Sequence, residues 1–168
     1  MFITIINDCA DANAAGRQQT RVSALFGVQP AFIGLGSGLG AAAEYQAAGC
    51  MIDILDAAGD GEGVVLVNVA PRSRAGKKWF NGTPFGYFRY KNILVVSTVA
   101  GYALSLVKKL GLTEEISVLK LEESVRGAAA DGLISAEEAE RIVLTQFRSF
   151  DFVPRAAKWL SDKRELPV

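Results

Sequence analysis

The sequence predicts an α/β domain with three layers and a largely parallel sheet. Short apolar runs typical of buried strands alternate with longer segments whose apolar residues recur at helical spacing. This alternation is typical of helices that cover both faces of a parallel sheet. A chain of 168 residues suits one ordinary domain, so we expect residues 1–168 to fold as a single unit.

The first elements follow from apolar runs and the residues that end them. Phe2–Ile6 is a short apolar run that meets the polar pair Asn7-Asp8, which predicts a buried strand with a polar carboxyl end. Apolar residues at helical spacing predict a helix over Ala14–Phe26, and Gly27 ends it. Ala31–Leu35 is the next predicted strand.

A long helix and a third strand come next. Ala41–Ala58 places four apolar residues on one helical face, namely Ala48, Met51, Ile52 and Leu55. The Gly59-Asp60-Gly61 segment stops this helix, and Val64–Val67 follows as a strand.

The second half of the chain predicts a hairpin followed mainly by helices. Tyr87–Tyr90 and Ile93–Ser97 flank Lys91-Asn92 and are expected to pair as a hairpin. Ser135 with Glu138 forms a capping-box pattern, which predicts a helix reaching about Phe147. The remaining predicted elements are a helix over Ala103–Leu110, a strand over Ser117–Leu121 and a helix over Pro154–Leu160.

Composition narrows the classes of function. Eighteen basic residues balance eighteen acidic ones, so charge gives no reason to expect a nucleic-acid or membrane partner. The chain has no histidine, which removes the usual general base near neutral pH and the commonest metal ligand. Cys9 and Cys50 lack metal-ligand spacing, and no long apolar segment is present, so we expect a soluble cytoplasmic protein without a metal.

Three motifs each have a structural alternative. The glycines of residues 34–40, with Asp56 beyond them, resemble a dinucleotide-binding loop, but the helical pattern places Asp56 inside a helix and favours a plain connection. Residues 131–138 resemble half of a calcium-binding loop, and a turn before a capped helix explains them better. The aromatic residues of 79–90 suit either the core or a stacking surface, and Trp79 and Phe85 stay open between the two.

Polar residues end three of the predicted strands: Asn7-Asp8, Asn68 and Ser97-Thr98. The carboxyl ends of parallel strands meet at one edge, so these side chains are expected to form a crevice, with Arg72 or Arg74 nearby. Such a group suits a small polar ligand. Asn68 and the following Pro71 also suit a simple turn.

Several segments resemble a known family in collinear order. Asn7-Asp8-Cys9-Ala10 ends the first strand, and Val67-Asn68-Val69-Ala70-Pro71-Arg72 with Arg74 ends the third. Residues 96–104 read Val-Ser-Thr-Val-Ala-Gly-Tyr-Ala-Leu, and residues 145–154 read Thr-Gln-Phe-Arg-Ser-Phe-Asp-Phe-Val-Pro. Together they resemble the amino-terminal domain of the S-adenosylmethionine hydroxide adenosyltransferases, the family that includes the fluorinases and chlorinases that use S-adenosylmethionine.

The resemblance implies a ligand and a changed catalytic set. Asp8 matches the family carboxylate that holds the ribose hydroxyls. Asn7, Ser97 and Thr98 would lie beside it. Asn68, Arg74 and Arg148 occupy positions where hydrolytic members carry the Asp, Arg and His thought to activate water. Neither an amide nor an arginine can take up a proton as a general base, so the water-activating set is degenerate at two of these three positions.

The family also has a carboxyl-terminal β domain, and its ligand lies between that domain and the amino-terminal domain of a neighbouring subunit in a trimer. The present residues resemble only the amino-terminal domain, so we expect a homotrimer or a partner chain to complete the pocket.

Three functional hypotheses follow. The first is a diverged domain that binds S-adenosylmethionine or adenosine, needs no cofactor, and has lost the water-activating chemistry. The second is a slow hydrolase that yields adenosine and L-methionine, with bound water oriented by Asn68 and Arg74. The third is an assembly protein without catalysis, in which Trp79 and Phe85 would anchor an interface.

Overall fold

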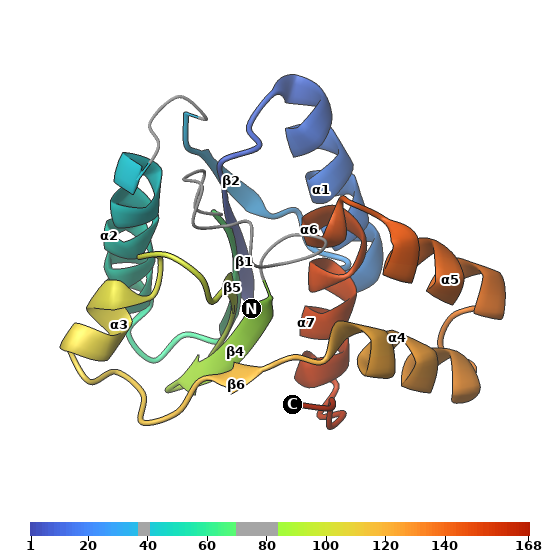
Figure 1. Ribbon diagram of the computed structural model, residues 1–168. Coiled ribbons are helices and arrows are strands. Elements are labelled where there is room, and N and C mark those ends of the chain that lie inside the picture. The colour runs from blue at the N-terminus through green and yellow to red at the C-terminus, as the bar shows by residue number, and fades with distance from the viewer. Residues whose placement is uncertain (37–40, 70–83) are drawn as a thin grey trace.

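The computed structural model describes residues 1–36, 41–69 and 84–168. These residues form an α/β fold around a six-stranded, mostly parallel mixed sheet (Figure 1), which confirms the predicted fold class. The strand order is β2-β1-β3-β5-β4-β6. The strands are β1 (Phe2–Asn7), β2 (Ala31–Gly34), β3 (Gly63–Asn68), β4 (Phe85–Tyr90), β5 (Ile93–Thr98) and β6 (Ser117–Val118).

Helices cover both faces of the sheet. In Figure 1, α2 (Ala41–Ala58) and α3 (Ser105–Lys109) lie on one side, and the remaining helices lie on the other. Those are α1 (Ala12–Phe26), α4 (Leu121–Ala130), α5 (Ala136–Leu144), α6 (Arg148–Asp151) and α7 (Val153–Ser161). Each face has its own buried apolar cluster, as expected for a three-layer domain.

Local sequence signals set several helix boundaries. The Asp11 side chain caps α1 by accepting hydrogen bonds from the backbone amides of Asn13 and Ala14 at 3.1 and 3.0 Å. Gly27 ends α1 in the left-handed conformation, with φ of 67°. The predicted cap of α5 is confirmed, because Ser135 Oγ accepts the backbone N–H of Glu138 at 3.0 Å.

Two predicted elements of the second half are wrong in extent. The strand predicted over Ser117–Leu121 ends at Val118, and Leu121 instead begins α4, which the sequence reading missed. Tertiary packing decides this, because α4 buries the apolar side chains of Val125 and Ala128 in the core. A longer edge strand would not bury them there, so the helix is the more stable structure. The helix predicted to reach Phe147 ends at Leu144, where Thr145 turns extended, with ψ of 143°.

Strand register determines which residues lie together at the carboxyl ends of the parallel strands. β1, β2, β3 and β5 are parallel, whereas β4 pairs antiparallel with both β5 and β6. Asn7 lies opposite Asn68, and Val67 lies opposite Ser97, so the polar strand ends gather at one edge as predicted. Among the described residues, no helix is both long and apolar enough to cross a membrane.

Candidate functional site

The site lies where the chain changes direction across the sheet. The connection from β1 to β2 runs through α1 on one face, and the connection from β2 to β3 runs through α2 on the other face. β1 and β3 are neighbours, so their connections diverge at the carboxyl edge between them. Such a switch point is where open α/β sheets bind ligands. Asn7 and Asn68 face each other at this point.

A chain of side-chain amides crosses this edge. Asn68 Nδ2 donates to Asn7 Oδ1 at 2.9 Å, and the same oxygen accepts the backbone N–H of Cys9 at 2.8 Å. Asn7 Nδ2 donates to Gln18 Oε1 at 2.7 Å, and Gln18 Nε2 donates to the carbonyl of Ser149 at 3.2 Å. Asn7 is fully buried, and each of its side-chain polar atoms has a partner.

The backbone groups at the two ends fix the direction of this chain. The N–H of Cys9 can only donate, and the carbonyl of Ser149 can only accept. If Asn7 and Gln18 reversed their amide groups, the Cys9 N–H would lose its acceptor and Gln18 would present an oxygen to the Ser149 carbonyl. The group at position 68 must therefore donate to Asn7, which an amide does and an ionised carboxylate cannot.

Asp8 lies beside this pair. Its backbone N–H donates to the Asn68 carbonyl at 3.2 Å, and the residue is only 3% exposed. A small cavity of about 280 Å³ opens at the ends of β1 and β2, lined by Asp8, Asp11, Ala10, Gly34, Leu35 and Gly36. Gly34 allows the close approach of the two strand ends, since a Cβ there would lie 2.7 Å from that of Ala10. The sequence-predicted residues Asp8 and Asn68 are thus brought together.

The two predicted hydroxyl residues are committed to the backbone. Ser97 Oγ donates to the Thr98 carbonyl at 3.0 Å, and Thr98 Oγ1 donates to the Val69 carbonyl at 2.9 Å. Both residues are buried, with exposed fractions of 1% and 0%. The Thr98 hydroxyl therefore holds the end of β5 against the segment after β3.

Arg148 begins α6, next to the residue that ends the amide chain. Its Nε is buried and has no hydrogen-bond partner among the described residues. Burial lowers the pKa of Arg148 below its ordinary value, yet an arginine remains a cation and not a base. Arg74, the third predicted member of the degenerate set, lies outside the described residues, as do Arg72 and Trp79.

Two other sequence-based alternatives are resolved by placement. Asp56 lies in α2, so it does not end a strand as the acid of a dinucleotide site must. Phe85 is 5% exposed and packs in the core, so the suggestion that it anchors an interface is wrong. It lies in β4 opposite Thr98, within the sheet.

Sequence reasoning missed Gln18 and the cluster around Asp151. Gln18 lies on the buried stripe of α1 between Ala14 and Val22, and a polar residue on an apolar stripe is the signal that could have revealed it. Asp151 is buried and accepts both Arg17 Nη2 contacts, at 3.0 and 2.9 Å. These partners are 134 positions apart, and no local pattern relates them.

The Asp151 cluster contains more guanidinium groups than carboxylates. Arg21 Nη2 lies 3.4 Å from Asp151 Oδ1, and Arg155 Nη1 donates to the Asp151 backbone carbonyl at 2.7 Å while also pairing with Glu138. The guanidinium of Arg17 also lies over the ring of Phe150, 5.5 Å from its centroid. This network fastens α1 to α6 and so supports the Gln18 end of the amide chain.

The chain matches no protein-family model, no curated protein and no solved structure.

Proposed function

We propose that this chain is a diverged relative of the S-adenosylmethionine hydroxide adenosyltransferases that binds an adenosine-containing ligand and lacks the water-activating chemistry. The observation that carries the proposal is the pairing of Asp8 with Asn68 at the switch point between β1 and β3. A carboxylate at such a crevice is a common partner for ribose hydroxyls.

The chemistry of the edge favours a ligand that donates hydrogen bonds. An ionised Asp8 carboxylate is only an acceptor. Asn68 donates an amide hydrogen to Asn7, so its Oδ1 is an acceptor without a partner in the described part of the chain. Ribose hydroxyls and an exocyclic amine supply donors for the Asn68 oxygen, and a ribose hydroxyl can also donate to a carboxylate. The cavity of about 280 Å³ lies just below the usual range for small-molecule sites, about 300–1,000 Å³, which supports completion of the pocket by another surface.

The loss of hydrolysis follows from the same hydrogen bonds. A general base must accept the proton of the attacking water, and Asn68 is held as a donor to Asn7. Arg148 is a cation, and the chain has no histidine that could replace it. The proposed function is therefore binding without efficient turnover.

Calorimetry tests the binding half of the proposal. Adenosine and S-adenosylmethionine are titrated into the intact chain and into Asp8→Asn, with Asp60→Asn as the control for loss of a carboxylate at an exposed site. We expect binding to weaken about tenfold to a hundredfold in Asp8→Asn, as for loss of a charged hydrogen-bond partner, and to stay unchanged in the control. Equal affinity in both variants would refute the assignment of Asp8.

Chromatography for adenosine and L-methionine tests the catalytic half. We expect no product above the rate of the protein-free reaction. Turnover that disappears in Asn68→Ala or Arg148→Gln would instead establish the slow hydrolase, because a water held by fixed dipoles can react without a general base.

A further inference from the structure

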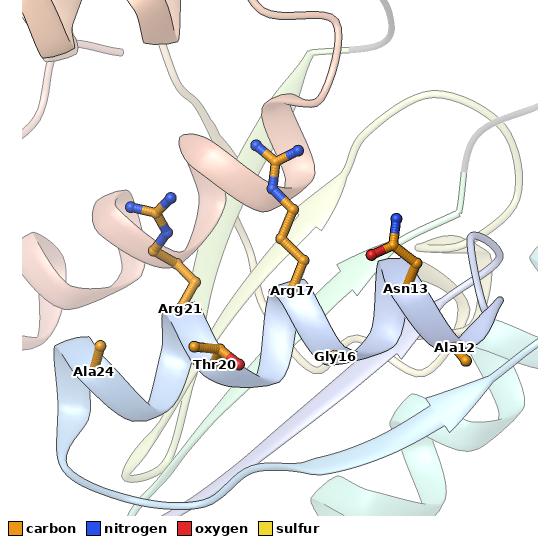
Figure 2. Close-up of a pocket in the computed structure, with 7 residues that line it drawn as sticks. All are labelled: Ala12, Asn13, Gly16, Arg17, Thr20, Arg21 and Ala24. Carbon is orange, nitrogen blue, oxygen red and sulfur yellow. The ribbon is translucent and has the colours of Figure 1, made fainter.

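The outer face of α1 carries a shallow, open groove of about 520 Å³ that is lined by residues of α1 alone and includes two arginines. Its floor is formed by the small residues Ala12, Gly16, Thr20 and Ala24, and Arg17 and Arg21 stand along its side. Figure 2 shows the two arginine side chains leaving α1 in the same direction. From Ala12 to Ala24 a helix rises about 18 Å, so the groove is long enough for about three turns of another helix.

Charge is segregated between α1 and α2. α1 contains two arginines and no acidic residue, and they are 42% and 26% exposed although both contact Asp151. α2 contains no basic residue, and its exposed outer face carries Asp53 and Asp56. In the described parts of the chain, neither of these aspartates takes part in an ion pair. A chain that is neutral overall therefore presents a basic helix on one layer and an acidic helix on the other.

Among the described residues, nothing packs closely against the glycines in the middle of these two helices. Glycine in a helix interior is less stable than alanine, so it needs a reason. A Cβ built at Gly16 or at Gly49 would meet no atom within 4 Å. Small residues at such positions let a second helix approach closely. Gly127 in α4 shares this property, but its neighbour Arg126 is paired with Glu122 and Glu140.

We propose that the α1 groove of one copy binds the outer face of α2 of a second copy. Arg17 and Arg21 are four residues apart and Asp53 and Asp56 three apart, so each pair lies on one side of its helix at comparable spacing. α1 and α2 lie on opposite faces of the sheet (Figure 1), so the contact joins two copies head to tail. Such a contact builds a closed ring or an open chain of subunits. This interface is independent of the proposed ligand.

Sedimentation equilibrium of Gly16→Ala, Gly49→Ala and Gly127→Ala tests the close approach. All three variants are expected to melt at or above the temperature of the unmodified chain, because alanine is the better helix residue. The dissociation constant of self-association should rise about tenfold or more in Gly16→Ala and Gly49→Ala and stay unchanged in Gly127→Ala. An unmodified chain that stays monomeric at high concentration would refute the proposal, as would equal association of all three variants.

Charge reversal tests the pairing itself. Arg21 is the residue to reverse, because its contact with Asp151 is longer than the two that Arg17 makes. Arg21→Glu therefore leaves the closer Arg17–Asp151 pair in place. We expect Arg21→Glu to weaken association about tenfold and the triple change Arg21→Glu, Asp53→Arg, Asp56→Arg to restore it. Failure of the triple variant to recover, with its thermal unfolding intact, would overturn the α1–α2 pairing.

Discussion

Replacing Asn68 by aspartate should destabilise this fold, although it would supply the carboxylate that the proposed function associates with hydrolysis. The change removes the Asn68 Nδ2 donor and places an anionic oxygen against Asn7 Oδ1, 2.9 Å away. Asn7 cannot reverse its amide, because its oxygen also accepts from Cys9 and its nitrogen donates to Gln18. Asn7 Oδ1 keeps the Cys9 N–H, but the new aspartate oxygen meets an acceptor where it needs a donor. A polar group left unsatisfied in this way costs about 1–3 kcal/mol, and for a domain of this size that lowers the Tm by roughly 2–12 °C.

The cost should depend on pH with a definite sign. The new carboxyl of the Asn68→Asp variant can donate to Asn7 when it is protonated. The folded state therefore favours the protonated form and raises the pKa of that carboxyl above the unfolded value of about 3.9. A raised pKa gives stability that is present below the unfolded pKa and is lost as the pH rises through the folded pKa. Urea unfolding of Asn68→Asp and the unmodified chain at acidic and neutral pH measures this difference. A variant as stable as the unmodified chain at neutral pH would refute the fixed direction of the amide chain.

Three further changes probe the contacts around the site. Asp151→Asn should lower the free energy of unfolding, measured in urea, by about 2–4 kcal/mol. This is less than the loss expected for a fully buried pair, because Arg17 and Arg21 are partly exposed. Asp162→Asn, at an exposed ion pair, is the control and should change the free energy of unfolding by less than about 1 kcal/mol. Gly101→Ala should lower the melting temperature more than Gly111→Ala does. Both glycines have positive φ, so alanine costs about 1–2 kcal/mol at either position. Only at position 101 would the new Cβ also overlap a side chain, the carboxylate of Glu44. Desolvation raises the pKa of Tyr45 above 10.0, and Tyr102 and Glu44 add to this effect. The ultraviolet titration of Tyr45 should therefore have its midpoint above 10.0, and the midpoint should fall in Tyr102→Phe. Because the folded-state pKa is raised, the stability that this group contributes is lost as the pH rises through that pKa.

Local patterns predicted the elements that local chemistry controls. The bounds of α2 agree with the prediction, because an apolar face defines the helix and Gly59, with φ of 57°, ends it. The hairpin around Lys91 was likewise predictable from two strand-forming runs separated by two residues. α4 was missed although its main helical partner, α5, follows it directly in the chain, because the burial of Val125 and Ala128 in the core cannot be read from a local window.

In the candidate site, too, some features follow from local sequence and others depend on contacts between distant residues. That Asn7, Asn68 and Ser97 share one edge follows from parallel strands, and the register confirms it. Which partner each polar atom takes does not follow, because Asn68 reaches Asn7 across 61 positions and Gln18 reaches Ser149 across 131. Ser97 and Thr98 illustrate the consequence, since residues predicted to meet a ligand turn their hydroxyl hydrogens to backbone carbonyls.

The proposed loss of hydrolysis has a firmer basis in the fold than in the sequence. In the sequence, asparagine at position 68 is a single residue that one substitution would turn into a carboxylate. In the fold, the amide is one of several groups whose donors and acceptors alternate from the Cys9 N–H to the Ser149 carbonyl. A carboxylate at position 68 would need a different residue at position 7, and position 7 in turn constrains Gln18. The donor at position 68 is therefore tied to two other side chains, and a proton acceptor would fit there without cost only if Asn7 and Gln18 changed with it.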